Sequence, residues 1–162
     1  MKRLWFPLLS SFVAILGLLG LQGCTSIQGT KQFKQTELTL ATIGDTEWVL
    51  KAWTFDEPEP VNPEVTLIYR DGQFTGKSGC NRFFVSVKDR EMAGDISVGL
   101  GGSTKMACPD STMEVEHRFL DQLSRIKKFG FMDTRLALSF EKDGAWRVML
   151  FEGRKTKPAG KP

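Results

Sequence analysis

The residues with the most versatile side-chain chemistry in this chain are its three cysteines, Cys24, Cys80 and Cys108. A thiol can be acylated, oxidised to a disulfide, used in redox catalysis or bound to a metal ion. Cys80 and Cys108 do not form a C-x-x-C redox motif, and a metal site completed by His117 would have only three scattered ligands, which is a poor zinc signature. The segments around the cysteines indicate which chemistry each one performs.

Cys24 follows a segment with the character of a bacterial export signal. Residues 1–3 are positively charged, residues 4–21 are mostly apolar, and Leu21-Gln22-Gly23-Cys24 resembles the lipobox of bacterial lipoproteins. We therefore expect cleavage before Cys24, acylation of that cysteine and lipid anchoring in the outer membrane, with the domain facing the periplasm or the cell surface. An uncleaved membrane anchor and ordinary secretion are the alternatives.

If Cys24 carries the lipid, Cys80 and Cys108 remain as an even pair in an exported chain. Such a pair usually forms a disulfide in an oxidising compartment. Closing the loop between them would stabilise the fold by about 3.5 kcal/mol. A redox-active pair or a metal-bound pair is the alternative.

The sequence offers no constellation typical of an active site. His117 is the only histidine, and no serine or cysteine lies near it in a nucleophile motif. The acid pairs Glu57/Glu59 and Glu114/Glu116 are predicted to lack the buried environment that general acid catalysis needs. We therefore expect no enzymatic activity, no cofactor and no metal ion.

The most specific polar residues lie beside the two downstream cysteines. Asn81, Arg82 and Lys105 are candidates for a binding edge, since the cysteines would hold them toward one side of the domain. The alternative is that Asn81 makes a local turn contact and that the two basic side chains are simply solvated. Met106 could line a neighbouring groove or fill the core.

The rest of the chain predicts one small domain built mainly from short strands. Apolar residues alternate with polar ones in several segments, and Asp71-Gly72 and Asp143-Gly144 are typical of tight hairpin turns. We expect Trp48, Leu50 and Ala52 on one face of the first strand and Trp146, Val148 and Leu150 on one face of the last. The predicted divisions are a signal peptide at 1–23, a flexible tether at 24–42, the domain at 43–152 and a disordered basic tail at 153–162.

A single helix is predicted after Pro109. Ser111 to Glu114 has the form of a capping box, and apolar residues follow at helical spacing up to Ile126. Arg125, Lys127 and Lys128 would suit the negative end of the helix dipole. The expected fold class is α+β, an antiparallel meander forming a partly open, barrel-like sheet of about seven or eight strands covered by one helix.

Three motifs together resemble the META, or HslJ-like, domain family. They are Gly76-Lys77-Ser78-Gly79-Cys80-Asn81-Arg82-Phe83, then Ser103-Thr104-Lys105-Met106-Ala107-Cys108-Pro109, then the helix residues Met113, Glu116, Phe119, Leu120 and Leu123. The resemblance extends over residues 46–151. It implies this barrel-like fold and an envelope setting, and the fold is similar to that of secretin-pilot lipoproteins, which hold acyl chains.

The function that this resemblance implies is non-enzymatic. Family members are linked to heat shock and novobiocin resistance, so the first hypothesis is a lipoprotein that supports outer-membrane integrity or stress resistance by binding a protein. The second is a module that binds a lipid or another hydrophobic ligand, and a hydrolase has little support. Nucleic acid is excluded as a partner, because the chain has an export signal and no basic face with interleaved aromatic residues. A large apolar cavity would favour the lipid hypothesis, and an exposed apolar patch on a solid core the protein hypothesis.

Overall fold

The computed structural model describes residues 38–54 and 61–155, which belong to one structural unit. The predicted signal peptide, the acylation site Cys24, most of the predicted tether and residues 156–162 of the predicted tail lie outside the described residues. So do Glu57 and Glu59. The described part contains no helix that is long and apolar enough to span a membrane.

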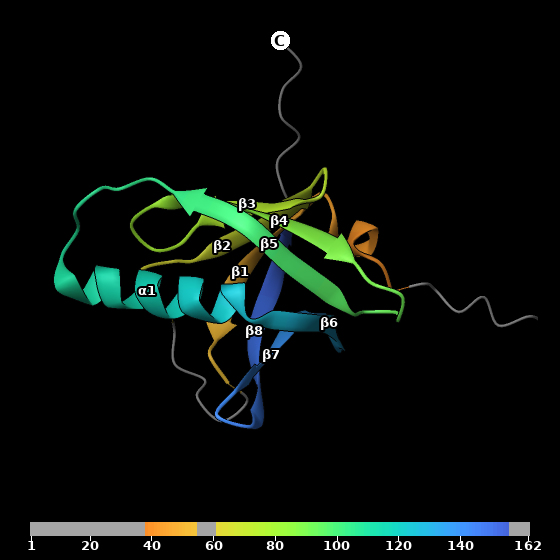
Figure 1. Ribbon diagram of the computed structural model, residues 1–162. Coiled ribbons are helices and arrows are strands. Elements are labelled where there is room, and N and C mark those ends of the chain that lie inside the picture. The colour runs from red at the N-terminus through yellow and green to blue at the C-terminus, as the bar shows by residue number, and fades with distance from the viewer. Residues whose placement is uncertain (1–37, 55–60, 156–162) are drawn as a thin grey trace, which may run out of the picture. The chain divides into compact units, whose positions relative to one another are not determined.

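Eight antiparallel strands form one curled sheet in the order β5-β4-β3-β2-β1-β8-β7-β6, and the single long helix α1 lies across its open side (Figure 1). This half-barrel agrees with the predicted fold class. The strands are β1 (Thr46–Ala52), β2 (Thr66–Arg70), β3 (Gln73–Lys77), β4 (Arg82–Asp89), β5 (Ile96–Ser103), β6 (Ile126–Met132), β7 (Arg135–Lys142) and β8 (Ala145–Lys155).

Tight turns set the register of the hairpins. Asp71 and Gly72, between β2 and β3, have φ values of 50° and 76°, and Asp143 and Gly144, between β7 and β8, have 53° and 72°. These left-handed conformations match the right-handed twist of the flanking strands, which is why Asp-Gly is favoured there. Both predicted hairpin turns are confirmed.

Helix α1 spans Asp110–Ser124. Its N-cap is Pro109, which makes no side-chain cap hydrogen bond, so the predicted capping box at Ser111 and Glu114 is wrong. The helix also ends earlier than predicted, because Ile126 begins β6 and is buried there opposite Phe140 of β7. Lys127 and Lys128 therefore belong to a strand and not to the end of the helix.

The main core fills the space between the concave face of the sheet and α1. Phe119 and Leu123 of the helix meet strand residues that alternate along the sheet, among them Phe83, Val85 and Val87 of β4 and Leu136, Leu138 and Phe140 of β7. Phe83 and Phe119 stack edge to face with ring centroids 5.2 Å apart. This edge-to-face contact adds to the stabilisation that burial of apolar area provides.

Val148 and Leu150 share one face of β8, as expected, but this is not the face that enters the main core. Met149 and Phe151 enter the main core, whereas Val148 and Leu150 pack on the opposite face in a second small cluster. Ala52 joins that second cluster as well, because a register shift between Leu50 and Ala52 changes which face the residue meets. A one-residue slip moves every later side chain to the other face, so alternation alone could not place these residues.

The sequence upstream of β1 also enters the fold. A short 3-10 helix, η1 (Leu40–Ile43), buries both of its terminal residues. The indole Nε1 of Trp48 donates a 3.0 Å hydrogen bond to the carbonyl of Ile43, which fixes η1 against β1. The domain therefore starts before residue 43, and β8 continues to Lys155, past the predicted start of the tail.

The two edge strands meet only at one end of the sheet. Asp95, just before β5, forms a bridge with Lys128 of β6, and the amide of Phe129 donates to the carbonyl of Gly94. Beyond this point β5 continues beside α1 and not beside β6 (Figure 1). The helix thus occupies the opening of the half-barrel.

Candidate functional site

The three motif segments come together at one end of the sheet. Cys80 and Cys108 form a disulfide with their Cα atoms 6.1 Å apart, which confirms the predicted pairing. The bond ties the β3–β4 turn to the segment that leads into α1. This places the first motif, the second motif and the helix in direct contact.

Glu116 of α1 is the centre of this junction. Its side chain is only 3% exposed, and its carboxylate accepts hydrogen bonds from the hydroxyl of Ser78 at 2.9 Å, the backbone amide of Asn81 at 2.8 Å and Asn81 Nδ2 at 2.9 Å. Burial raises the pKa of this carboxyl, but these bonds and one from the amide of Cys80 outweigh burial and hold the pKa below its usual value. Glu116 is therefore a buried, ionised acceptor.

Asn81 extends the network to the second motif. Its Oδ1 accepts from Thr104 Oγ1 at 2.7 Å and from the amide of Met106 at 2.7 Å, while Nδ2 also donates to the carbonyl of Met106 at 3.3 Å. The residue is 1% exposed. Asn81 consequently presents no binding edge, and its contacts reach much further along the chain than the local turn expected from sequence.

Glycines allow the first motif to adopt this shape. A Cβ at Gly76 would lie 2.0 Å from the carbonyl oxygen of Thr66, so only glycine permits the close crossing of β2 and β3. Gly79 has a φ of 119°, which an L side chain rarely adopts, and it carries the backbone past the start of α1. The small residues therefore bring Ser78 and Asn81 to Glu116.

This network does not have the properties of a catalytic site. Ser78 is fully buried and the Glu116 carboxylate is occupied by four donors, so neither is open to a substrate. The interpretation of Glu116 as an unburied acid is wrong. One feature of the sequence could have predicted that Glu116 is buried. The glycine-rich turn at residues 76–79 has backbone amides that need an acceptor, and an acid on the following helix can supply one.

His117, by contrast, is exposed on α1 beside this network, as predicted. Within residues 38–54 and 61–155, no group of three histidine, cysteine or acidic side chains is placed to hold a metal ion.

Arg82 and Lys105 are both exposed, in agreement with their predicted place at the surface. Arg82 lines a hollow of about 660 Å³, here called the outer hollow, together with Lys77, which faces it across β3 and β4. Its other lining residues include Ile68 and Met106, and the acids Glu47 and Glu64, whose carboxylates pair with Arg154. The lining of the outer hollow thus combines apolar side chains with two cations and two acids.

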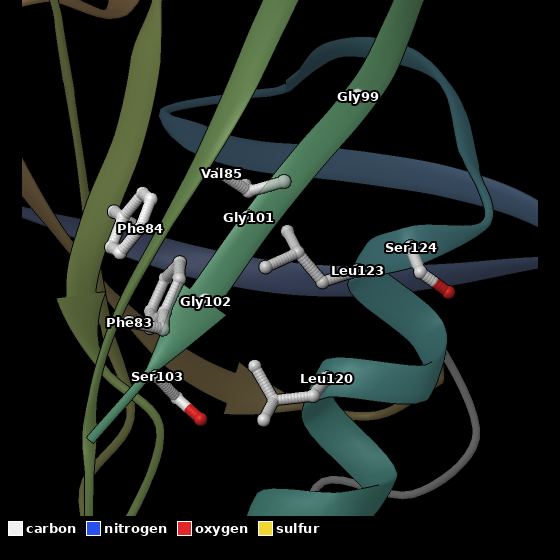
Figure 2. Close-up of a pocket in the computed structure, with 10 residues that line it drawn as sticks. All are labelled: Phe83, Phe84, Val85, Gly99, Gly101, Gly102, Ser103, Leu120, Leu123 and Ser124. Carbon is white, nitrogen blue, oxygen red and sulfur yellow. The ribbon is translucent and has the colours of Figure 1, made fainter.

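A second concavity runs between β5 and α1, and is called here the β5–α1 groove. It has a volume of about 250 Å³. Figure 2 shows Leu120 and Leu123 extending from α1 toward the strands, where Phe83 and Val85 of β4 lie behind the glycines of β5. Because Gly99 and Gly101 have no side chains, the groove stays open along this strand.

Two large apolar side chains project into solvent from β4 and β5. Phe84 is 52% exposed and Leu100 is 93% exposed. We call the area around them the β4–β5 surface. The sequence did not predict it, because residues 99–102 contain three glycines and lack the alternation of a strand, whereas they form the second half of β5. The available signal was the complete lack of charge from residue 96 to residue 103.

The sequence matches the META domain family model over residues 41–153, which is more than half of the chain. Among solved structures, the fold is similar to the NMR structure of a protein from Burkholderia xenovorans, with 26% identity, a TM-score of 0.56, and coverage of 72% of this chain and 86% of that one. A second NMR structure is 18% identical with a TM-score of 0.50, covering 69% of this chain and 92% of its own, and supports the fold alone.

No functionally curated protein matches the sequence significantly. The family model includes the Cys80–Cys108 disulfide and the Glu116 network within its range. The chain therefore belongs to the META domain family.

Proposed function

We propose that this protein is a non-enzymatic envelope lipoprotein, anchored through an acylated Cys24, whose META domain binds a protein partner and so supports outer-membrane integrity under heat or antibiotic stress. The observation that carries the proposal is the β4–β5 surface, where Phe84 and Leu100 are exposed over a filled core. Exposed apolar side chains that gather in one area are a feature of protein contacts. The HslJ-like resemblance of the motifs supports the stress role.

The size of the β5–α1 groove favours a protein over a buried lipid. Small-molecule sites usually enclose about 300–1,000 Å³. The groove has about 250 Å³ and opens along a strand. It is better suited to a few side chains of a partner than to an acyl chain.

Polar contacts at the rim are assigned to Arg82 and Lys105. Both adjoin a cysteine of the disulfide and both are exposed. Their charges would orient an acidic stretch of the partner, because rim charges mainly steer association. His117 has no part in this contact.

Survival of cells under heat or novobiocin tests this function. Cells that carry Leu100→Lys or Phe84→Ser in the full chain should lose resistance at matched protein levels, and those with Arg82→Ala or Lys105→Ala should lose part of it. Trp146→Ser is the matched control, since Trp146 is 56% exposed on β8, away from the β4–β5 surface. Full resistance in all β4–β5 variants, or a loss with His117→Ala alone, would contradict the proposal.

The outer hollow supports a second candidate function, the binding of an anionic lipid. Its volume of about 660 Å³ lies within the range of small-molecule sites, and Lys77 and Arg82 stand beside Ile68 and Met106. Native mass spectrometry of the purified full chain would detect a retained lipid. Binding that disappears in Lys77→Ala and Arg82→Ala would favour this candidate, and its absence in the unaltered protein would remove it.

A further inference from the structure

β5 has a free backbone edge over most of its length. It is the terminal strand of the sheet, and the bridge to β6 involves Asp95, which precedes it. In the described part of the chain, no strand pairs with residues 96–103 on the side away from β4. An unpaired strand edge is a template for another strand.

The hydrogen-bond pattern identifies the groups that are free on this edge. The amide of Thr104 donates to the carbonyl of Arg82. Since backbone groups alternate between the two edges of an antiparallel strand, Gly102 faces Phe84 of β4, whereas the amides and carbonyls of Gly101 and Ser103 face outward. These outward groups are positioned to pair with an added strand.

β5 lacks two of the features that protect exposed edges, although its pairing with β4 shifts register between Val98 and Gly101 and α1 lies beside it. Natural edge strands carry charged residues, often lysine, or proline. β5 has neither in its sequence ISVGLGGS, and its central Leu100 is 93% exposed. An edge without charge or proline does not add to the stability of the isolated domain.

We propose that β5 receives an extended segment of a partner protein as a ninth strand, whose alternate apolar side chains enter the β5–α1 groove. The proposal rests on the protein-binding function and names the form in which the partner is recognised. The added strand would satisfy the outward groups of Gly101 and Ser103, and its side chains would contact Leu120 and Leu123. This is strand addition with pockets for every second side chain.

The residues of β5 argue against a second copy of this chain as the occupant. Gly101 and Ser103 pair with Val85 and Phe83, so they lie on the face that is turned toward the core. A second β5 would therefore offer glycine and serine to the groove and leave it unfilled. A partner strand with valine, leucine or isoleucine at alternate positions fills it.

A bare acyl chain fits this edge less well. It could cover Leu120 and Leu123, but it has no donors or acceptors for the backbone of β5. Covering those polar groups without hydrogen bonds carries a free-energy cost. The combination of a free backbone edge and an apolar groove is satisfied by a peptide.

The test uses the full chain in detergent and synthetic peptides in which threonine alternates with valine, leucine or isoleucine. Amide hydrogen exchange measured by NMR should show protection of Gly101 and Ser103 when such a peptide binds. The same peptide N-methylated at its alternate residues should not bind, because it cannot pair with the edge. Equal binding by the N-methylated peptide, or no binding by any of these peptides at millimolar concentration, would overturn strand addition.

Two variants separate the edge from the surface around it. Leu100→Lys places a protective charge on the edge, and Ser103→Pro removes one outward amide, so each should weaken peptide binding by about tenfold or more. Trp146→Ser is the matched control and should bind normally. Concentration-dependent dimerisation that is lost in Leu100→Lys would instead identify a second copy as the occupant and overturn the proposal. If the peptides fail while the Phe84→Ser cells still lose resistance, the protein-binding function stands without strand addition.

Discussion

At the scale of single residues, the domain depends on a carboxylate that the motifs surround. Glu116 joins the turn of the first motif to α1, and Asn81 joins the same turn to the second motif. A buried charge is tolerated only when hydrogen bonds replace its hydration, and here the donors all come from Ser78, Cys80 and Asn81 in the β3–β4 turn. One network thus joins the three family motifs at this end of the sheet.

Glu116→Gln should lower the free energy of unfolding by about 2–3 kcal/mol. The NH2 group of the glutamine side chain would face groups that are themselves donors. The charge-assisted hydrogen bonds from Ser78 and Asn81 would also be lost. Glu114→Gln is the matched control, because Glu114 lies exposed on the same helix and should change stability little. Urea denaturation measures both, and equal stability of the two variants would refute the role of Glu116.

The same residue predicts how stability depends on pH. Burial raises the pKa of Glu116, but the donors on Ser78, Cys80 and Asn81 lower it further, so the folded pKa lies below the unfolded value. The resulting stabilisation is complete above the unfolded pKa and disappears as the pH falls through the folded pKa. Glu116→Gln should therefore show a shallower loss of stability below about pH 4.5 than the unaltered protein. Parallel acid profiles of the two proteins would contradict this prediction.

At the scale of elements, the sequence predicted the strands with clean alternation and both Asp-Gly turns. It failed where local signals conflicted with tertiary pairing. Ile126 continues the helical spacing of α1, yet it is buried against Phe140 as the first residue of β6. The register shift near Ala52 and the inward face of β8 depend on neighbours from distant segments, which no local period contains.

The face of β8 that enters the main core gives a direct prediction. Phe151 is fully buried in the main core, whereas Trp146 is mostly exposed. Phe151→Ala should therefore cost about 3–5 kcal/mol of unfolding free energy, and Trp146→Ala much less. Thermal or urea unfolding distinguishes the two, and a larger loss for Trp146→Ala would contradict the placement of Phe151 in the main core.

The disulfide acts on the segment that precedes α1. It is expected to stabilise the domain by about 3.5 kcal/mol. Without it, the Asn81 side chain and two hydrogen bonds between Thr104 and Arg82 hold this segment to the first motif. A Cys80→Ala/Cys108→Ala variant should lose that stability and show faster hydrogen exchange at the amide of Met106. Unchanged exchange there would mean that the network alone fixes the segment.

At the scale of the whole molecule, the motifs predicted the family, the fold class and the disulfide, but not the exposed apolar residues of the β4–β5 surface. The motifs correspond to the Glu116 junction, because that junction requires glycines at its close contacts and hydrogen-bond donors around the carboxylate. The β4–β5 surface depends on a segment of β5 that has no charged residues and several glycines. In sequence, an uncharged glycine-rich segment is typical of a loop. Only the pairing of β5 with β4 shows that the glycines form an open edge.

The most direct test of the central claim is photo-crosslinking from position 100 in living cells. The full chain, with a photoreactive amino acid in place of Leu100, should crosslink to a specific envelope protein. When that partner protein is purified, the crosslinked product should be purified with it. The same amino acid at position 146, which is exposed on a different hairpin, should give no such product. A protein-binding domain predicts the crosslink at position 100 alone. Equal crosslinking from both positions, or products that contain only lipid, would contradict the account.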